Sequence, residues 1–434
     1  MSAHPADFPG DPEAAHRLRL AREVEVGVDR LQRCREVFVR WLGESYDLLA
    51  LDAVLAAAAV EQLDGDPVWL LLVSGSGNAK TETVSALLGA GAHVTSTITS
   101  EGALLSATSN KEKAKDATGG LLRKIGASGV LVVKDVTSIL SMNRDSRAAV
   151  LAALREVYDG RWERNVGTDG GKTLTWTGRI VLVGAVTTAY DAAHAVIAAM
   201  GDRFALVRVD SNLGRLEAGR QALLNVGHED EMRRDLSDAA AACLAHVDPQ
   251  RAELTDEVMG VLLTAANVVT LARTAVERDH RGEVVEAHAP EAPTRFAKML
   301  GQLVRGSLAL GSTKVEALAV ALRVAGDSVP PMRLLVLADV LDNSYARTSE
   351  VTKRVQRPRS TVDRTLQELH LLGLVEVDEV GDGLGWRYRV APSVDQQALR
   401  VLVTRNVTTP GVRVKEVPLA TDIPGDGPAQ ESAW

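Results

Sequence analysis

The sequence predicts an α/β protein with a parallel sheet, followed by a helical subdomain and a small basic module. Three observations support this prediction. Short continuous apolar runs alternate with helical spacing up to about residue 212, only helical spacing follows over 213–325, and Pro330-Pro331 precedes an arginine-rich segment. Buried parallel strands appear as continuous apolar runs, whereas helices show a repeat of about 3.6 residues. The alternation therefore predicts a layered α/β domain in the first half of the chain.

The strands of this sheet are expected where apolar runs end in turn residues. They cover residues 68–73, 130–133, 180–183 and, more weakly, 205–209, with helices between them at 82–88 and 147–158. Ahead of the first strand, Leu48, Leu51, Val54 and Leu55 have helical spacing. The order is therefore helix, then alternating strands and helices, as in doubly wound sheets.

Composition limits the class of protein. The 434 residues exceed one ordinary domain, and 46% hydrophobic with 24% charged residues is a globular composition. With 49 basic and 57 acidic residues the formal charge is −8, which argues against a globally basic nucleic-acid coat but allows local basic patches. Cys34 and Cys243 are the only cysteines, which excludes a disulfide framework and a cysteine zinc site and indicates a reducing compartment.

Neither an export signal nor a membrane span is expected. Residues 1–16 contain prolines and acids where a signal peptide has a basic start and an apolar stretch. The most apolar stretches, 47–60 and 258–271, are interrupted by Asp52 and Asn267 and are shorter than the roughly 20 residues of a spanning helix. The sequence thus predicts a cytoplasmic protein that does not contact a membrane.

A glycine-rich loop follows the first strand and precedes a helix. Its sequence is Ser74-Gly75-Ser76-Gly77-Asn78-Ala79-Lys80-Thr81. A phosphate-binding loop needs backbone amides facing the anion, a helix after it, a lysine for the outer phosphates and a hydroxyl for magnesium. The predicted nucleotide contacts are Gly75, Ser76, Gly77, Asn78, Ala79, Lys80, Thr81 and Glu82. Since the strict pattern has glycine at Ser74 and Ala79, a plain Gly/Ser turn is the alternative.

The segments after this loop resemble the AAA+ ATPases, particularly their minichromosome-maintenance helicase branch. Alanine before the loop lysine, as at Ala79, is typical of that branch, and the segments ATGGLL (117–122), GVLVVKD (129–135) and SMN (141–143) follow in a similar order. The resemblance spans about residues 47–395. It implies an AAA+ P-loop NTPase core, a helical lid subdomain and a C-terminal winged helix. It also implies that ATP and Mg²⁺ bind, with Thr81 and Asp135 holding the metal.

One position departs from the family. Val136 stands where the family has a glutamate that orients the attacking water. Glu101 and Glu156 are other carboxylates, but their spacing does not place either at the γ-phosphate. ATP binding is therefore expected, hydrolysis stays open, and a strand-ending acid that caps a turn is the alternative for Asp135.

Three further residues receive roles from the resemblance. The strand 181–186 resembles the family's sensor strand, with Thr187, or alternatively Thr188, in place of the usual asparagine. Gly201-Asp202-Arg203-Phe204 resembles the segment with the arginine finger, which acts on the nucleotide of the neighbouring subunit, and Arg295 resembles the sensor arginine. The alternative for Arg203 is a surface arginine at the start of a strand.

Residues 161–166 and 172–176 flank the turn 167–171 and predict a β-hairpin. In the resembled helicases a hairpin near this place points into the pore and grips the nucleic-acid backbone. Arg161, Arg164 and Lys172 would do so here, and a solvated hairpin without this role is equally compatible.

The last structured segment has helices at 332–341, 348–355 and 361–370, the last capped by Ser360, and strands at 375–377 and 386–390. This order is that of a winged helix-turn-helix. Six basic residues and two acids between Arg347 and Arg364 make this stretch positive in an acidic chain. The expected DNA contacts are Arg357, Arg359, Thr361, Arg364 and Arg387. A module that binds protein is the alternative.

These assignments divide the chain into a helical leader (1–45), a nucleotide-binding core (46–212), a helical lid (213–328), the winged helix (329–395) and a C-terminal tail that is expected to be partly disordered (396–434). The histidines show no metal-ligand spacing, and no hydrolase triad is recognisable. The predicted function is an ATPase that acts on DNA as a ring-forming homo-oligomer, with a hexamer as the expected form, such as a helicase or translocase. A DNA-bound regulator with a nucleotide switch and an assembly scaffold with a dead site are the alternatives.

Overall fold

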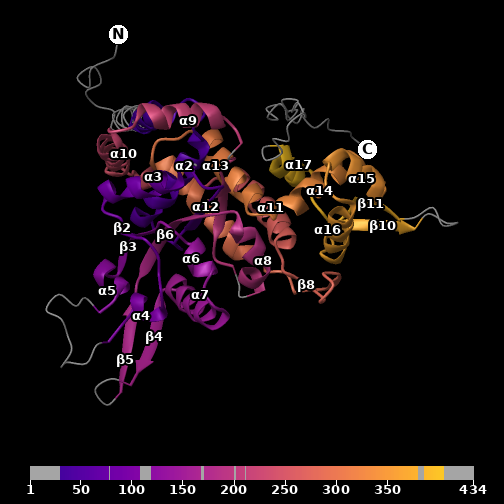
Figure 1. Ribbon diagram of the computed structural model, residues 1–434, viewed down its shortest axis with the longest axis horizontal. Coiled ribbons are helices and arrows are strands. Elements are labelled where there is room, and N and C mark those ends of the chain that lie inside the picture. The colour runs from indigo at the N-terminus through magenta and orange to yellow at the C-terminus, as the bar shows by residue number, and fades with distance from the viewer. Residues whose placement is uncertain are drawn as a thin grey trace, which may run out of the picture.

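The computed structural model describes residues 30–77, 79–107, 119–167, 171–199, 202–210, 212–379 and 386–404. Figure 1 shows a body that contains the sheet, a helical region beside it and a C-terminal module at the far side. The sheet and helices together form a mixed α/β fold, as predicted. The predicted leader before residue 30 and the tail after residue 404 lie outside the described residues.

A five-stranded parallel sheet forms the centre of the body. Its strands are β1 (Trp69–Val73), β2 (His93–Thr95), β3 (Ser128–Val133), β6 (Arg179–Val186) and β7 (Ala205–Arg208), in the spatial order β2-β3-β6-β1-β7. The predicted strands 68–73, 130–133, 180–183 and 205–209 all correspond to strands of this sheet. β2 was not predicted, because three half-buried residues give too short an apolar pattern.

Both faces of the sheet are covered. Along β1, Leu70 and Leu72 point into one apolar cluster, while Trp69, Leu71 and Val73 point into the other. Side chains alternate between faces in a strand, so a wholly apolar strand indicates helices on both sides. The structure thereby explains why β1 lacks any polar residue.

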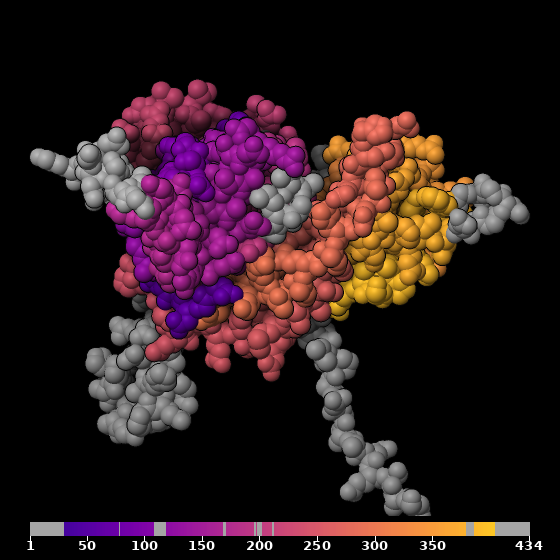
Figure 2. Space-filling model, turned by 90° about the horizontal axis from the view of Figure 1, so that it is seen from below, coloured from indigo at the N-terminus to yellow at the C-terminus, as the bar shows by residue number. Residues whose placement is uncertain are grey.

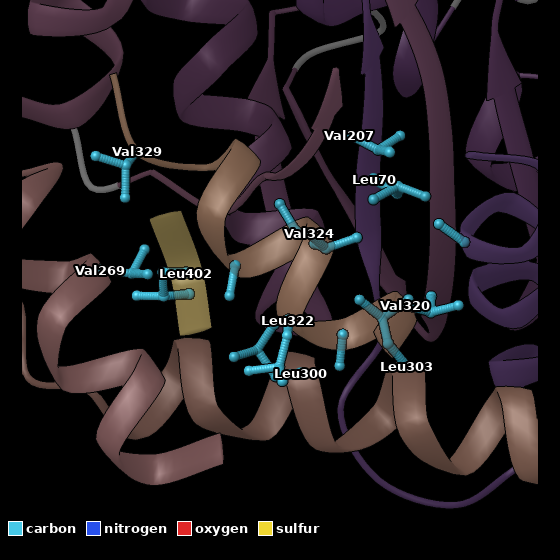
Figure 3. Packing of buried hydrophobic residues seen from close by; sticks show 14 of the residues in the cluster. Leu70, Val207, Val269, Leu300, Leu303, Val320, Leu322, Val324, Val329 and Leu402 are labelled. Atoms are coloured by element: carbon cyan, nitrogen blue, oxygen red, sulfur yellow. The ribbon is translucent and has the colours of Figure 1, made fainter. Parts of the chain in front are cut away.

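The first face packs against helices from distant parts of the chain. These are α2 (Leu48–Ala59), α12 (Thr294–Ala309) and α13 (Lys314–Asp327). Figure 3 shows Leu70 and Val207 of the sheet facing Val320 and Val324 of α13, with Leu303 of α12 nearby. Gly306 of α12 lies against the backbone of α2, where an added Cβ would be 2.2 Å from Ala56 O.

The second face is covered by α6 (Thr137–Leu140), α7 (Arg144–Tyr158) and α8 (Ala189–Ala199). The predicted hairpin is present as β4 (Arg161–Val166) and β5 (Lys172–Thr177), with Trp162 opposite Trp176. Both indoles are buried against this second cluster. The hairpin projects from the body at the bottom of Figure 1.

The free edge of β7 is occupied by side chains. The Leu206 N–H donates to Ser328 Oγ at 3.0 Å, and the Arg208 N–H donates to the Asp327 carboxylate at 2.8 Å. Unpaired strand edges can otherwise pair with other chains. The end of α13 therefore completes the hydrogen bonding of the edge strand.

The region after the sheet is mainly helical, with one exception. Val276–Arg278 (β8) and Val284–Ala287 (β9) form an antiparallel hairpin between α11 and α12. The prediction of helix alone over 213–325 is therefore wrong at this point, because strands of three and four residues are shorter than a period analysis can detect. The shorter and outer helices complete the body: α3 (Lys80–Ser85), α4 (Glu101–Leu104), α5 (Leu121–Ile125), α9 (Arg215–Leu224), α10 (Glu229–Leu244) and α11 (Asp256–Ala272).

The C-terminal module contains α14 (Pro331–Asp342), α15 (Thr348–Val355), α16 (Arg359–Leu371), α17 (Gln396–Thr404) and the hairpin β10 (Val375–Glu379) with β11 (Trp386–Val390). Ala346 forms an isolated antiparallel bridge with Tyr388, in the middle of β11. Ser360 lies inside α16 instead of capping it, since the helix begins at Arg359 after Pro358. The module's apolar residues belong to the same cluster as those of α2 and α12, so the predicted boundaries divide segments that share one core.

Candidate functional site

The loop between β1 and α3 lies at the carboxyl edge of the sheet. Two of its residues adopt positive φ, Gly77 at 86° and Ala79 at 49°. Positive φ is unusual for alanine and reverses the local chain direction. Ser76 and Gly77 are exposed, Gly75 and Ala79 are half-buried, and Asn78 lies outside the described residues.

Lys80 is buried and its ammonium folds back onto this loop. Its Nζ donates to Ser74 O at 3.0 Å, to Ser74 Oγ at 2.9 Å and to Gly75 O. Burial lowers the pKa of Lys80. In the part of the chain that the structure describes, no carboxylate forms an ion pair with this ammonium, so its charge is met by neutral oxygens alone.

The carboxyl ends of three strands meet near this loop. The Ser74 N–H donates to Val186 O at 3.3 Å, which puts Thr187 beside the loop. The Thr137 hydroxyl accepts from the Thr187 N–H at 3.0 Å and lies 3.3 Å from Thr187 Oγ1. Thr187 thus contacts the segment that follows Asp135. Thr137 was not predicted, although it is a hydroxyl residue two positions after that aspartate.

Asp135 is exposed and follows β3 at the same edge of the sheet. β6 lies between β3 and β1, so Asp135 is not on a strand adjacent to the loop. Parallel strands are about 4.8 Å apart, which separates the ends of β3 and β1 by about 10 Å. A ligand shared by Asp135 and Lys80 would have to extend across the end of β6.

Val136 does not face this edge. Its side chain is buried and packs in the cluster of the second sheet face. The two carboxylates considered in its place are not at the loop in any contact that the structure records. Glu101 accepts from Arg164 at 2.9 Å, and Glu156 is an exposed residue of α7.

Glu82 has a partner outside the predicted nucleotide contacts. Its carboxylate accepts from Arg233 of α10 through Nε and Nη2 at 3.1 Å. Thr81 is exposed at the start of α3 and is available to a metal. Tyr46 was not predicted near the loop, yet its hydroxyl lies 2.8 Å from Oγ1 of Thr83, a residue of α3.

The residues at this edge fit a magnesium–phosphate group. Lys80 supplies a positive charge that has no acidic partner in the described ranges, and Thr81 and Asp135 supply exposed oxygens. Mg²⁺ keeps several waters and takes one or two protein oxygens together with phosphates. Among the described residues no three His, Cys, Asp or Glu side chains cluster as a metal site would need on its own.

Arg203 and Arg295 lie at the opposite edge of the sheet. Both are near the start of β7, since Arg203 precedes that strand and Arg295 Nη1 donates to Asp202 O at 3.4 Å. Arg203 donates to Asp159 at 3.1 Å and lies over the Tyr158 ring, and Arg295 pairs with Glu291 at 3.2 Å. Because the phosphate loop follows the carboxyl end of β1, neither arginine can reach it within the same chain.

The basic residues of the β4–β5 hairpin do not share one surface. Arg161 is exposed and pairs with Glu163 on its own strand. Arg164 is on the other face, where it donates to Glu101 and to Leu105 O at 2.9 Å. Lys172 is exposed near the turn, of which residues 168–170 lie outside the described residues.

The predicted DNA-contacting face of α16 lies against the β8–β9 hairpin. Arg364 donates to Glu283 at 2.8 Å and to Arg281 O at 3.2 Å. Glu368, one helical turn further, is buried and accepts from Arg333 at 2.9 Å and from Arg278. In Figure 2 the salmon segment that contains these strands lies directly against the gold module.

The other predicted DNA contacts are more open. Arg357, Arg359 and Thr361 are exposed at the start of α16, and Arg387 donates to Tyr345 O at 3.2 Å. The local positive charge is smaller than counting along the sequence suggests. Arg354 pairs with Asp339 and Arg364 with Glu283, two acids that lie outside the counted stretch.

Comparison with known proteins adds no assignment. A scan against protein-family models and a search of curated proteins found no match to this chain. No helix in the described ranges is long and apolar enough to cross a membrane.

Proposed function

We propose that this protein binds ATP with Mg²⁺ at the loop between β1 and α3. The observation that carries the proposal is Lys80, a buried ammonium whose partners among the described residues are neutral oxygens of a loop with positive φ at Gly77 and Ala79. A phosphate group would supply the missing negative charge. Open parallel sheets bind ligands outside the carboxyl ends of their strands, which is where this loop lies.

The residues at this edge would have different roles in binding ATP and Mg²⁺. Lys80 would contact the outer phosphates, and Thr81 and Asp135 would hold Mg²⁺ through oxygen. Thr187, joined to Thr137, would contribute a hydroxyl between the two. The fold proposed for this arrangement is an AAA+ type core with a helical lid and a C-terminal winged helix.

We further propose that the protein acts on DNA as a homo-oligomer, with a hexameric ring as the expected form. The position of Arg203 before β7, away from the loop of its own chain, is compatible with an arginine finger that acts on the nucleotide of a neighbouring chain. Arg357 and Arg359, exposed at the start of α16, support DNA binding by the module.

A second function, a DNA-bound regulator that uses ATP as a switch, is favoured by one observation. The side chain at position 136 is buried in apolar contacts, and Glu101 is engaged by Arg164. Among the residues that the structure describes, no carboxylate is then evident at the site to orient water. Such a protein would bind ATP and hydrolyse it slowly or not at all.

Isothermal titration calorimetry with ATP and Mg²⁺ tests the nucleotide site. Lys80→Ala should abolish binding, and Thr81→Ala, at an exposed position, should weaken binding in Mg²⁺ more than in EDTA. Lys314→Ala, which removes an exposed lysine of α13, is the control and should bind as the parent does. Equal affinity in the parent and both loop variants would overturn the proposal.

Turnover measured with and without DNA separates the two functions. A DNA motor should hydrolyse ATP and accelerate when DNA is added. A regulator should bind ATP with the same dependence on Lys80 but show little turnover in either condition.

A further inference from the structure

A large groove separates the α/β body from the C-terminal module. Its volume is about 1010 Å³, and its walls come from α7 and α8 on one side and from α14 and α16 on the other, with the β8–β9 hairpin between them. Small-molecule pockets usually occupy about 300–1,000 Å³. An open groove at this upper limit suits a segment of a polymer better than a small ligand.

The three carboxylates that line the groove are already engaged. Asp191 accepts from Arg208 at 2.7 Å, and Glu277 lies 3.2 Å from His288 Nε2. Glu368 accepts from two arginines, Arg333 and Arg278. Two of the three acids are therefore paired with arginines, whereas the partner of Glu277 is a histidine, which carries charge only when protonated.

The remaining arginines leave the groove positive. Arg144 is exposed at the start of α7, and the structure records no partner for it among the described residues. Arg147, one turn along the same wall, donates to a neutral acceptor, Leu140 O at 2.9 Å, and no carboxylate partner is recorded for it in the described part of the chain. Across the groove, Arg364 has a carboxylate partner, Glu283, which is itself about half exposed.

We propose that this groove binds the phosphate backbone of a nucleic-acid strand, with Arg144 and Arg147 on one wall and Arg364 on the other. The inference rests on the proposed action on DNA but not on ATP binding. Arg357 and Arg359 at the exposed start of α16 extend the positive surface beyond the groove, as a polymer path requires. Phosphates would replace Glu283 as the partner of Arg364, and an exposed ion pair is weak enough to exchange in this way.

The position of α16 in the groove also restricts the access of duplex DNA to this helix. The face with Thr361, Arg364, Thr365 and Glu368 lines the groove and is opposed by the β8–β9 hairpin. A recognition helix must enter a major groove about 12 Å wide, which this hairpin obstructs. A single strand needs less room, so the groove should bind single-stranded DNA more tightly than duplex.

Fluorescence anisotropy with a labelled mixed-sequence single strand and its duplex tests the proposal on the full chain. Arg144→Ala/Arg147→Ala should weaken single-strand binding by about tenfold or more and reduce the slope of log K against log salt by about 1.4, as expected for two lost phosphate contacts. Arg144→Ala alone, at an exposed position, should show about half of that slope change. Arg215→Ala/Arg220→Ala is the matched control, because it removes two exposed arginines from α9, and should bind as the parent does.

The outcomes separate this inference from the proposed function. If the Arg144→Ala/Arg147→Ala variant binds DNA as tightly as the parent, the groove is not the DNA-binding site, while the proposed function stands. If the parent binds neither the single strand nor the duplex at low salt, both the proposed action on DNA and the proposed binding in the groove are wrong. Preferential binding of duplex over the single strand also contradicts the groove.

Discussion

The backbone N–H of Val136 donates to the carbonyl of Ala185 at 2.9 Å, which ties the residue after Asp135 to β6. The Val136 side chain is only 6% exposed. A Cβ added at Gly184 would lie 2.8 Å from a methyl of Val136 and 2.8 Å from one of Leu71, so these groups already pack tightly. Position 136 is thus part of the apolar core, whereas its neighbour Asp135 is exposed.

Restoring glutamate at this position should therefore fail to create a hydrolytic residue. Val136→Glu would place a carboxylate in apolar contacts, and we expect it to lower the unfolding free energy by about 3 kcal/mol without raising ATP turnover. Urea unfolding and an ATPase assay check both parts, with Val136→Leu as the apolar control. A stable Val136→Glu variant with increased turnover would contradict this assignment.

Arg203 should act only on a neighbouring chain. Arg203→Ala and Lys80→Ala should each lose turnover, but an equimolar mixture should regain about one quarter of it, because some interfaces then pair an intact loop with an intact arginine. The measurement is ATPase rate against mixing ratio, after exchange of subunits. If the unmutated protein hydrolyses ATP but the mixture of the two variants stays inactive, Arg203 does not act between chains.

Glu283 should restrain DNA binding by occupying Arg364. Glu283→Gln keeps the size of the side chain and removes its charge, so we expect DNA affinity to rise about threefold or more. Glu286→Gln removes an exposed charge from the same hairpin and serves as the control for net charge. If both substitutions raise affinity equally, the effect is one of net charge and the Arg364–Glu283 pair is irrelevant.

Two glycines in helices should respond to alanine in opposite ways. At Gly306 the added Cβ would meet Ala56 O at 2.2 Å, so Gly306→Ala should destabilise the protein by about 2 kcal/mol through overpacking. At Gly260 of α11 no atom lies within 4 Å of the added Cβ, and Gly260→Ala should stabilise by about 0.5–1 kcal/mol. Thermal unfolding followed by circular dichroism measures both changes.

His194 should make stability fall in acid. Burial, assisted by Arg333 and Arg273, lowers the pKa of His194 to about 4. The unfolded chain takes up this proton near pH 6.5, so between about pH 6.5 and pH 4 the unfolded state binds more protons and the folded state loses stability. On acidification the free energy of unfolding of His194→Gln should therefore fall by about 2 kcal/mol less than that of the parent, a value that allows for partial exposure of the side chain. Urea unfolding at pH 7 and pH 4.5 measures this fall in both proteins. If the free energy of unfolding falls equally in the parent and in His194→Gln, His194 does not contribute to the pH dependence.

The strands with strong apolar runs were predictable from the sequence, whereas contacts between distant segments were not. The runs at 68–73 and 180–183 identify β1 and β6 because every side chain there is buried. The pairing of Arg364 with Glu283 could not be predicted, since it joins α16 to a hairpin too short to show a period. The burial of Val136 was also hidden, because its neighbour Asp135 suggests an exposed turn. The positions of Lys80 at the start of α3 and of Asp135 after β3 were predictable because loop and strand patterns are local.

The capped edge of β7 has a consequence for how copies of this protein can associate. With Leu206 and Arg208 already bonded to Ser328 and Asp327, no strand of a second chain can extend the sheet on that side. The opposite edge, β2, offers only three residues. Extension of the five-stranded sheet into a second chain is thereby disfavoured at both of its edges.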